Sequence, residues 1–341
     1  MNTNITRRQA MALMAGAASA SAAGPAFAQA SELRFSSFEP PVAWVTSRVL
    51  KPWAEEVSKA SNGTLNINLF PGGALGKNPA QQLKLVQDGV ADIAWIVLGL
   101  TPGRFDDTDV VTLPYLTDTS AETSRAMWNM YARGEFDGFD EFKVLCIGAT
   151  PSAKLHGTGA IKGVEDINGK RIRANGSHLV EVVKRLGGVP VTMSGGQVAE
   201  SLSRGLLDQV IANFGFVGDF KVNEVATEHL IMPMGATAVM VAMRKDKFNA
   251  LPEAARKAID AHSGEAMSLR LGKEWDLQET EFMERITKSG KNNARTPDAD
   301  ELAKWKAAIE PINAEWRKAK PKNEKLYQSI VAELTKIRGG K

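Results

Sequence analysis

Arg173 is the residue in this sequence whose type and position best fit the binding of an anion. It ends a short segment, residues 171–173, that has one apolar and one cationic face and stands just before an Asn-Gly turn. A guanidinium at the end of a strand, beside the free backbone N–H groups that begin a helix, can hold a carboxylate in bidentate fashion. On spacing alone, a surface arginine that caps the strand or pairs with Glu181 or Asp166 explains the pattern equally well.

Residue types that support catalysis or metal binding form no recognisable pattern elsewhere. The four histidines lie at no metal-ligand spacing, and no Gly-x-Ser-x-Gly segment occurs. Cys146 is the only cysteine, which excludes an internal disulfide and a multi-cysteine metal site, and its apolar neighbours predict a buried strand position. We therefore expect no enzymatic activity, no metal site and no cofactor. The histidines are His156, His178, His229 and His262.

Alternating strands and helices surround Arg173. Strands are predicted at residues 171–174, 189–193 and 210–214. Between the first two, apolar residues recur at i, i+3, i+4 and i+7, as expected for a helix with Ser177 at its N-cap. The order is β-α-β-α-β. Open sheets of this kind bind ligands at the carboxyl ends of their strands, which is where Arg173 lies.

A second β-α-β-α-β pattern precedes this one. Strands are predicted at residues 33–37, 65–69 and 92–97, with helices at about 43–60 and 79–89 between them. The chain has 341 residues, of which 43% are hydrophobic and 24% charged. Two such patterns in a chain of this length and composition predict a protein of two globular domains.

Several segments resemble one family of transport proteins. GKRIRANG, LGGVPV and SLSRGLLD, around and after Arg173, are similar to the solute-binding proteins of tripartite ATP-independent periplasmic (TRAP) transporters of the DctP type. Three further segments are similar to the same family, in the family's order: WAEEVSKASNGTLNINLFPGGALG, QDGVADIAW and FNALPEAARKAI. The resemblance implies a two-lobed α/β periplasmic binding protein (type II-like, Venus flytrap fold) with a long helix that braces both lobes. It also implies that Arg173 clamps the carboxylate of the ligand.

The resemblance divides the chain into two lobes. Lobe I is expected to comprise residues 29–150 and 239–278, and lobe II residues 151–238 and 279–341. A continuous helical region from Leu251 to about residue 289 is long enough to reach both lobes. The last two helices should pack on the outside.

Three aromatic residues of the first lobe are candidates for the wall of a binding site. Trp95 lies near the carboxyl end of a predicted strand, and in similar proteins this position faces the ligand. A tryptophan of the core is the alternative. Phe38 and Trp44 have the same geometry after the first strand.

The second lobe departs from the family in ways that bear on the ligand. Many relatives place a second arginine about twenty residues before the first; here Lys154 is the nearest cation, so either it takes part of that charge or Arg173 is the only cation of the clamp. Asn213, with Phe214 after it, is the nearest polar candidate at the end of the third strand. Gly195 stands where relatives carry an aromatic residue, and the loss of that ring should enlarge the pocket.

A wide pocket with aromatic walls and one arginine favours a bulky monocarboxylate, such as an aromatic acid, over a small dicarboxylate. A C4-dicarboxylate is the alternative ligand. The expected role is to capture the acid and deliver it, as a monomer, to the small and large subunits of a TRAP membrane permease. A ligand-binding partner of a membrane sensor kinase would share every local feature and is the alternative role.

Residues 1–28 are predicted to be a signal peptide, which places the remaining chain in the periplasm. Arg7 and Arg8 precede an alanine-rich apolar stretch, and residues 26–28 fit a small-x-small cleavage site. The arginine pair is similar to a twin-arginine signal, although residues 10–11 depart from that pattern, and Sec export is the alternative. Loss of the two arginines lowers the formal net charge from +3 to +1. Nothing in this charge points to nucleic acid.

Overall fold

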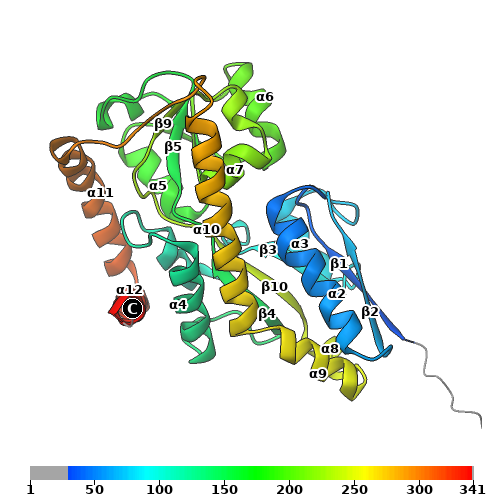
Figure 1. The fold of residues 1–341 in the computed structure, drawn as a ribbon. Helices are drawn as coiled ribbons and strands as arrows, with labels where there is room; N and C mark the ends of the chain where they lie inside the picture. The colour runs from blue at the N-terminus through cyan, green and yellow to red at the C-terminus, as the bar shows by residue number, and fades with distance from the viewer. Residues whose placement is uncertain (1–29, 340–341) are drawn as a thin grey trace, which may run out of the picture.

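Residues 30–339 are described by the computed structural model, in which two lobes are built on separate sheets (Figure 1). Lobe I carries a five-stranded sheet of order β2-β1-β3-β10-β4. The first three of its strands in the chain are parallel to one another, and β10 runs antiparallel to both of its neighbours. The chain therefore leaves this sheet after β4 and returns to it as β10. The strands are β1 (Ser31–Ser36), β2 (Leu65–Phe70), β3 (Ile93–Val97), β4 (Phe142–Ala149) and β10 (Ala238–Arg244).

Lobe II carries a six-stranded sheet of order β11-β9-β5-β8-β6-β7. β6 pairs in parallel with both β7 and β8, so the β-α-β-α-β order predicted around Arg173 is confirmed. The third of these strands ends earlier than predicted, because Asn213 already caps the following helix. The strands are β5 (Lys154–Gly157), β6 (Arg171–Arg173), β7 (Val189–Val191), β8 (Gln209–Ala212), β9 (Glu228–Leu230) and β11 (Asn293–Arg295).

Side chains alternate along β10, so the two faces of the lobe I sheet belong to different cores. Met240 and Ala242 join one core, whereas Val239 and Val241 join the other. The first core is covered by α3 (Gln82–Gln87), α4 (Ser120–Ala132) and α12 (Pro321–Gly339), and the second by the π-helical η1 (Thr46–Leu50), α2 (Lys51–Ala60), α8 (Lys245–Asn249) and α9 (Glu253–His262). Short 3-10 helices complete the lobe: η2 (Pro79–Gln81), η3 (Leu98–Leu100) and η4 (Asp106–Thr112).

The lobe II sheet is covered in the same way on both faces. Ile172 packs on one side with Val182 and Trp305, and Val210 packs on the other with Val198 and Phe214. The first side is covered by α5 (Ser177–Arg185) and α11 (Ala299–Ala319), and the second by α6 (Val198–Ser203) and α7 (Phe214–Asp219). Its 3-10 helices are η5 (Val164–Ile167), η6 (Gly195–Gln197) and η7 (Val222–Glu224).

One long helix, α10 (Glu265–Thr287), reaches both lobes (Figure 1). It packs against α4 and β4 in lobe I and against α7 in lobe II, as the predicted brace should. The prediction of one continuous helix from Leu251 was wrong, because α9 ends at His262 and a new helix starts after Gly264. Gly264 has a φ of 75°, a value at which residues other than glycine are strained.

Two carboxylates within one turn of α10 tie the lobes to it. Asp276 accepts hydrogen bonds from the backbone N–H groups of Ser120 (2.7 Å) and Ala121 (2.9 Å), at the start of α4. Glu279 accepts one from the backbone N–H of Gly215 (3.1 Å), in the first turn of α7. Carboxylates are favourable partners for helix N-termini. A single turn of α10 thus holds one helix of each lobe.

The C-terminal helix differs from the predicted division of the chain. α12 packs on lobe I, where Leu326 and Ile330 join the core that contains Met127 and Met130 of α4. The expected assignment of residues after 320 to lobe II is therefore wrong for this helix. The physical reason is that the apolar side of α4 away from the sheet needs a cover, and α12 supplies it. α11 remains with lobe II as expected.

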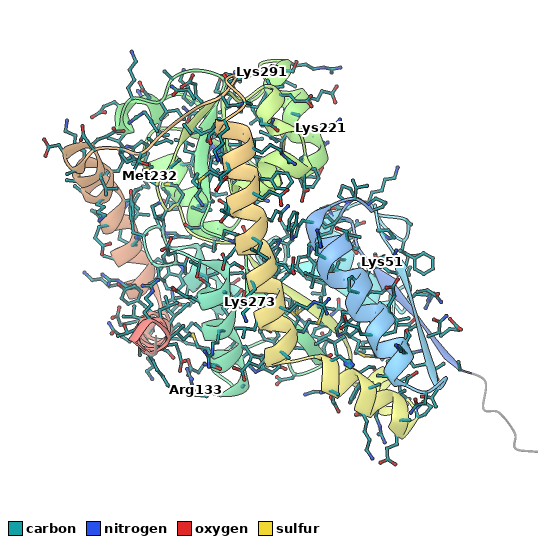
Figure 2. The ribbon with its side chains drawn as sticks, viewed as in Figure 1. Lys51, Arg133, Lys221, Met232, Lys273 and Lys291 are labelled. Atoms are coloured by element: carbon teal, nitrogen blue, oxygen red, sulfur yellow. The ribbon has the colours of Figure 1, made fainter. Side chains whose placement is uncertain are left out.

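Gly272 sets how closely α10 approaches α4. A Cβ here would lie 2.6 Å from the Cα of Ala121 and 2.8 Å from the carbonyl oxygen of Ser120. These are backbone atoms that cannot rotate away, so we expect Gly272→Val to lower the free energy of unfolding by about 1–3 kcal/mol, as overpacked cores do. The measurement is a thermal melt against Lys273→Val, at the neighbouring exposed position of α10 (Figure 2). Equal melting temperatures would contradict the expectation.

Candidate functional site

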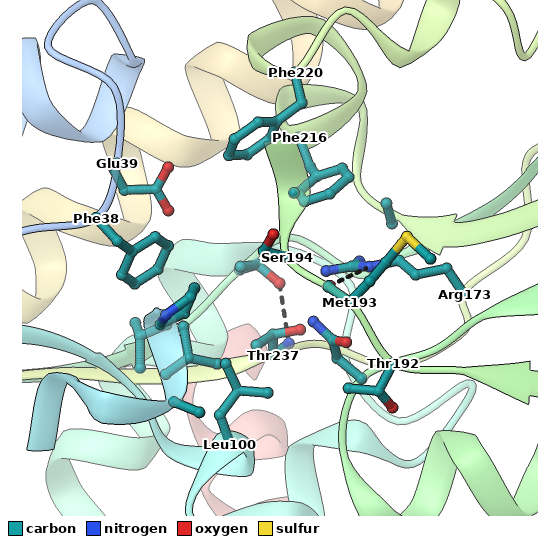
Figure 3. A pocket seen from close by; sticks show the side chains of 18 of the residues that line it. Phe38, Glu39, Leu100, Arg173, Thr192, Met193, Ser194, Phe216, Phe220 and Thr237 are labelled. Carbon is teal, nitrogen blue, oxygen red and sulfur yellow. Dashed lines mark hydrogen bonds between the residues drawn. The ribbon is translucent and has the colours of Figure 1, made fainter. Parts of the chain in front are cut away.

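A cavity of about 600 Å³ lies between the two lobes. It is lined in lobe I by β3 and the segment after β1, and in lobe II by the segments after β6 and β7 and by α7 (Figure 3). The carboxyl ends of several strands meet there, which is the usual binding position in open α/β sheets. Its lining includes Phe38, Glu39, Trp95, Arg173, Phe216 and Phe220.

Arg173 lines the cavity from the carboxyl end of β6 and is only 6% exposed. Its Nε donates to the carbonyl oxygen of Met193 (3.5 Å), and its Cζ lies 4.4 Å from the ring centroid of Phe216. The Asn175 amide is oriented so that its nitrogen donates a hydrogen bond to the carbonyl oxygen of Ala174. In this orientation, Asn175 Oδ1 accepts a hydrogen bond from Arg173 Nη2 (2.5 Å). All of these partners are neutral, so they orient the guanidinium without balancing its charge.

No acidic side chain among residues 30–339 forms an ion pair with Arg173. Burial lowers the pKa of Arg173 to about 10, which still leaves a cation at neutral pH. The two surface pairings left open by the sequence are not formed. Asp166 accepts instead from the backbone N–H of Lys162 (2.7 Å), and Glu181 lies 4.0 Å from Arg185. A buried cation without a counter-ion is costly, and an anion in the cavity would offset that cost.

Aromatic rings of α7 form the wall beside Arg173. The ring centroids of Phe216 and Phe220 lie 4.7 Å apart, and both rings face the cavity (Figure 3). Phe220 also covers Gly195, where an added Cβ would lie 2.7 Å from the Phe220 ring. The predicted enlargement of the pocket at Gly195 is therefore wrong, because Phe220 occupies the space beside the glycine.

Trp95 combines both roles that the sequence left open. It is 1% exposed, belongs to the lobe I core, and packs edge-on against Trp275 of α10 with ring centroids 5.7 Å apart. It also lines the cavity. Its indole nitrogen is buried and forms no hydrogen bond with any described residue. Buried indole N–H groups usually find an acceptor, so Trp95 has an unused donor at the cavity.

Glu39 faces the cavity from the side opposite Arg173 (Figure 3). It is half-buried, and its carboxyl group forms neither an ion pair nor a hydrogen bond of good geometry with any described residue. Burial, together with the negative charge of Asp219, raises the pKa of Glu39 to about 8, against a smaller opposing effect of the nearby Trp95 N–H. That N–H lies close without reaching hydrogen-bond geometry. Glu39 is therefore largely neutral at pH 7.

Of the other predicted site residues, Phe38 and Asn213 line the cavity. Phe38 also packs against the lobe I core. The side-chain oxygen of Asn213 accepts a hydrogen bond from the backbone N–H of Phe216 (2.7 Å) and so caps α7. Asn213 thereby holds the helix that brings Phe216 to Arg173.

Trp44 and Phe214 do not line the cavity. The indole N–H of Trp44 donates to Glu274 of α10 (3.2 Å), so this residue fastens the first helical segment to the brace. Phe214 is fully buried beside His156 and His229, with ring centroids 5.1 and 5.3 Å away. The structure thus gives both aromatic residues packing roles.

Lys154 also lies outside the lining of the cavity, although Ala153 before it is part of that lining. Its Nζ donates to Glu279 of α10 (2.5 Å) and to the carbonyl oxygen of Ser152 (2.8 Å). The side chains of Lys154 and Glu279 are 14% and 11% exposed. Its charge is therefore balanced by Glu279 and is not directed at the cavity.

Two of the scattered histidines meet in the fold. His156 of β5 pairs with His229 of β9, and their Nδ1 atoms lie 2.7 Å apart. Burial, more than their mutual repulsion, lowers the pKa of His156 well below its usual value, and burial also lowers that of His229. In the part of the chain that the structure describes, no group of three or more His, Cys, Asp or Glu side chains could hold a metal ion.

The helix after Arg173 begins differently from the prediction. Gly176, with a φ of 88°, occupies the N-cap of α5, and Ser177 is its first helical residue. The Ser177 hydroxyl donates to Asp109 of η4, which belongs to lobe I. This hydrogen bond joins the two lobes close to the cavity.

Glu39 and Phe220 were missed by reasoning from the sequence. An acidic residue after β1 lies at the same sheet edge as Trp95, and that position was the available signal for Glu39. Phe220 stands at the end of a short helix, and nothing in its spacing indicates that its ring covers Gly195, 25 residues earlier.

Comparisons with known proteins agree with the two-lobed fold. The model of a family described as bacterial extracellular solute-binding protein, family 7, matches residues 35–319. A TRAP solute-binding protein from an unidentified marine microbe, specific for aromatic acid ligands and crystallised with 3-hydroxybenzoate, is 28% identical, with a TM-score of 0.84 over 90% of this chain and 99% of that one. A TRAP solute-binding protein from Rhodoferax ferrireducens T118 with copurified benzoate is 27% identical, with a TM-score of 0.84 over 90% and 98% of the two chains.

Among curated proteins, the outer membrane transporter protein TsaT of Comamonas testosteroni is 27% identical over 303 residues, which is 85% of this chain and 87% of TsaT. Within residues 30–339, no helix is both long and apolar enough to cross a membrane.

Proposed function

This chain belongs to family 7 of the bacterial extracellular solute-binding proteins, and on that premise we propose that it captures an organic acid through Arg173 and delivers it to a TRAP membrane permease. The observation that carries the proposal is the buried, uncompensated charge of Arg173 in a cavity between two lobes. A ligand carboxylate would supply the missing charge and accept the free N–H groups of the guanidinium.

Closure of the lobes would strengthen this pairing. Coulomb attraction between two charges grows as water is excluded from between them. A ligand that touches both lobes binds the closed arrangement more tightly than the open one, and it therefore shifts the protein toward closure. The hydrogen bond between Ser177 and Asp109 already joins the lobes beside the cavity. A ligand that contacts both lobes would add to this contact, so binding of the ligand and closure of the lobes would be coupled.

The expected ligand is a bulky monocarboxylate, such as an aromatic acid. Phe38, Trp95, Phe216 and Phe220 offer flat apolar surfaces to the cavity, which suit an aromatic ring better than a short polar chain. The marine and Rhodoferax proteins, at 28% and 27% identity, were solved with 3-hydroxybenzoate and benzoate. A small dicarboxylate would leave these rings without a partner. No observation favours the alternative role with a sensor kinase.

The remaining parts of the role follow from the family. We propose that residues 1–28, which lie outside the described residues, direct export to the periplasm by the twin-arginine or the Sec route. The proposed partners are the small and large subunits of a TRAP permease, which the protein would meet as a monomer.

A ligand screen tests the proposal. At a free ligand concentration of one hundred times the Kd, binding adds about 2.7 kcal/mol to the free energy of unfolding, so we expect aromatic monocarboxylates to raise the melting temperature by about 5 °C. The measurement is a thermal-shift series with benzoate, phenylacetate and succinate on the protein without residues 1–28. A rise with succinate alone would contradict the ligand class, and no rise with any organic acid would contradict the function.

A further inference from the structure

We propose that Glu39 and Trp95 form a second polar subsite, which recognises a hydroxyl group at the end of the ligand remote from its carboxylate. The inference rests on the proposed function, because Arg173 must hold the carboxylate end for the rest of the ligand to be placed. It narrows the expected ligand from aromatic acids in general to hydroxylated ones.

The first step is the position of the two residues. Glu39 lies across the cavity from Arg173 (Figure 3), and Trp95 lines the same cavity with its N–H near the Glu39 carboxyl group. Phe38, Phe216 and Phe220 line the cavity that separates these residues from Arg173. A flat acid whose carboxylate meets Arg173 would therefore direct its opposite edge toward Glu39 and Trp95.

The second step is that the subsite is fixed before a ligand arrives. The Glu39 backbone N–H donates to Ser37 Oγ (3.2 Å), and its carbonyl oxygen accepts from the backbone N–H of Gly72 (2.7 Å). Pro40 follows and restricts the chain further. Trp95 is locked in the core against Trp275. Preorganised groups of this kind lose little freedom when they bind.

The third step is the match of donors and acceptors. The Trp95 N–H is a buried donor without an acceptor. The Glu39 carboxyl group has acceptor oxygens in either protonation state, and no described residue makes a full hydrogen bond to them. A hydroxyl group both accepts and donates one hydrogen bond. It can therefore accept from Trp95 and donate to Glu39 at once, and satisfy both.

Other groups fit the pair less well. An ammonium group has only donors and would leave the Trp95 N–H unsatisfied. A second carboxylate could accept from the Trp95 N–H and from the protonated Glu39, but it would enter the negative field of Asp219, the same charge that helps to raise the pKa of Glu39. To balance its charge, such a carboxylate would have to pair with a cation, and Lys77 is a cation that also lines the cavity. A bare ring edge would leave both polar groups unpaired, which is costly.

The experiment compares ligands that differ only at the remote edge. Isothermal titration of the protein without residues 1–28 would use benzoate, 3-hydroxybenzoate, 4-hydroxybenzoate and isophthalate (benzene-1,3-dicarboxylate). The better of the two hydroxybenzoates should bind about tenfold more tightly than benzoate, the gain expected of well-made hydrogen bonds. Isophthalate should bind more weakly than that hydroxybenzoate. A hydroxyl group that brings no gain, or isophthalate as the tightest ligand, would overturn the inference.

Variants then assign the preference to residues. Glu39→Leu should markedly lower the ratio of hydroxybenzoate to benzoate affinity, leaving only the part that the Trp95 N–H supplies, whereas Glu39→Gln, whose amide oxygen still accepts, should keep most of it. Glu55→Leu, at an exposed glutamate of α2, is the matched control and should keep the full ratio. Retention of the ratio in Glu39→Leu would overturn the role of Glu39. If that variant does not fold, the wild-type ligand series still decides.

Failure of the underlying function has a different signature. If none of the four acids binds the wild-type protein, the aromatic ligand class is refuted and the subsite with it, and if succinate in the thermal-shift series has no effect either, the capture of organic acids is refuted as well. If benzoate binds through Arg173 but the hydroxyl group brings no gain, the proposed function stands and only the subsite is refuted.

Discussion

Replacement of Arg173 by alanine should abolish detectable binding of organic acids while the fold remains intact. The guanidinium is buried, oriented by neutral partners and unpaired among the described residues, so its charge contributes to binding and to no internal ion pair. Truncation of one partner of a buried charged pair costs about 2–5 kcal/mol, which lowers affinity roughly 30-fold to several thousand-fold. The melting temperature without ligand should stay the same or rise, since a buried cation is removed.

The matched control for this variant is Arg171→Ala. Arg171 lies two residues earlier in β6, on the same face of the strand, and pairs at the surface with Asp208 (2.9 Å). Its loss should change the ligand affinity little, because exposed ion pairs contribute about 0–1 kcal/mol. Arg173→Lys should also bind poorly, since an ammonium group cannot make the forked contact. Isothermal titration of the three variants measures this, and near-native affinity in Arg173→Ala would refute the clamp.

Replacement of Lys154 by methionine should destabilise the fold rather than remove the ligand site. Methionine keeps the apolar stem but leaves Glu279 partly buried beside Gly215 without its cation. Loss of one partner from a buried ion pair is expected to lower the free energy of unfolding by about 3 kcal/mol. Urea denaturation measures this change, and titration of the folded variant should show a far smaller loss of affinity than Arg173→Ala shows.

A double variant separates the two possible roles of Lys154. In Lys154→Met with Glu279→Leu, both charges are gone, and much of the lost stability should return. The opposite pattern is a Lys154→Met protein that is as stable as wild type but binds no acid. That pattern would mean that Lys154 shares the ligand's charge, as the position of the second arginine in relatives suggested.

The sequence sufficed for the parts of the fold that depend on local periodicity. The β-α-β-α-β order around Arg173 and the two C-terminal helices were predicted correctly, because apolar spacing reports which face of an element is buried. The break at Gly264 was missed, because the apolar pattern continues on both sides of it. The packing of α12 on lobe I was also missed, because spacing shows that a helix has an apolar face and not which surface covers it.

The site was predictable to the extent that strand ends determine it. Arg173, Trp95, Phe38 and Asn213 all line the cavity, since each ends, follows or lies near the carboxyl end of a strand in one of the two sheets. Lys154 begins β5, next to Ala153 in the cavity lining, but its partner Glu279 lies 125 residues away on α10. Contacts of that range depend on the assembled fold. The same reason explains why Phe220 was not predicted beside Gly195.

The two carboxylates of α10 limit how this molecule can open to release a solute. Asp276 holds the start of α4 and Glu279 holds the start of α7, with less than one helical turn between them. If the lobes swung apart about a distant axis, the hydrogen bonds of Asp276 or those of Glu279 would have to break. We therefore expect the pivot of the motion to pass through α10 near these residues, so that a small bend there becomes a wide displacement at the cavity mouth.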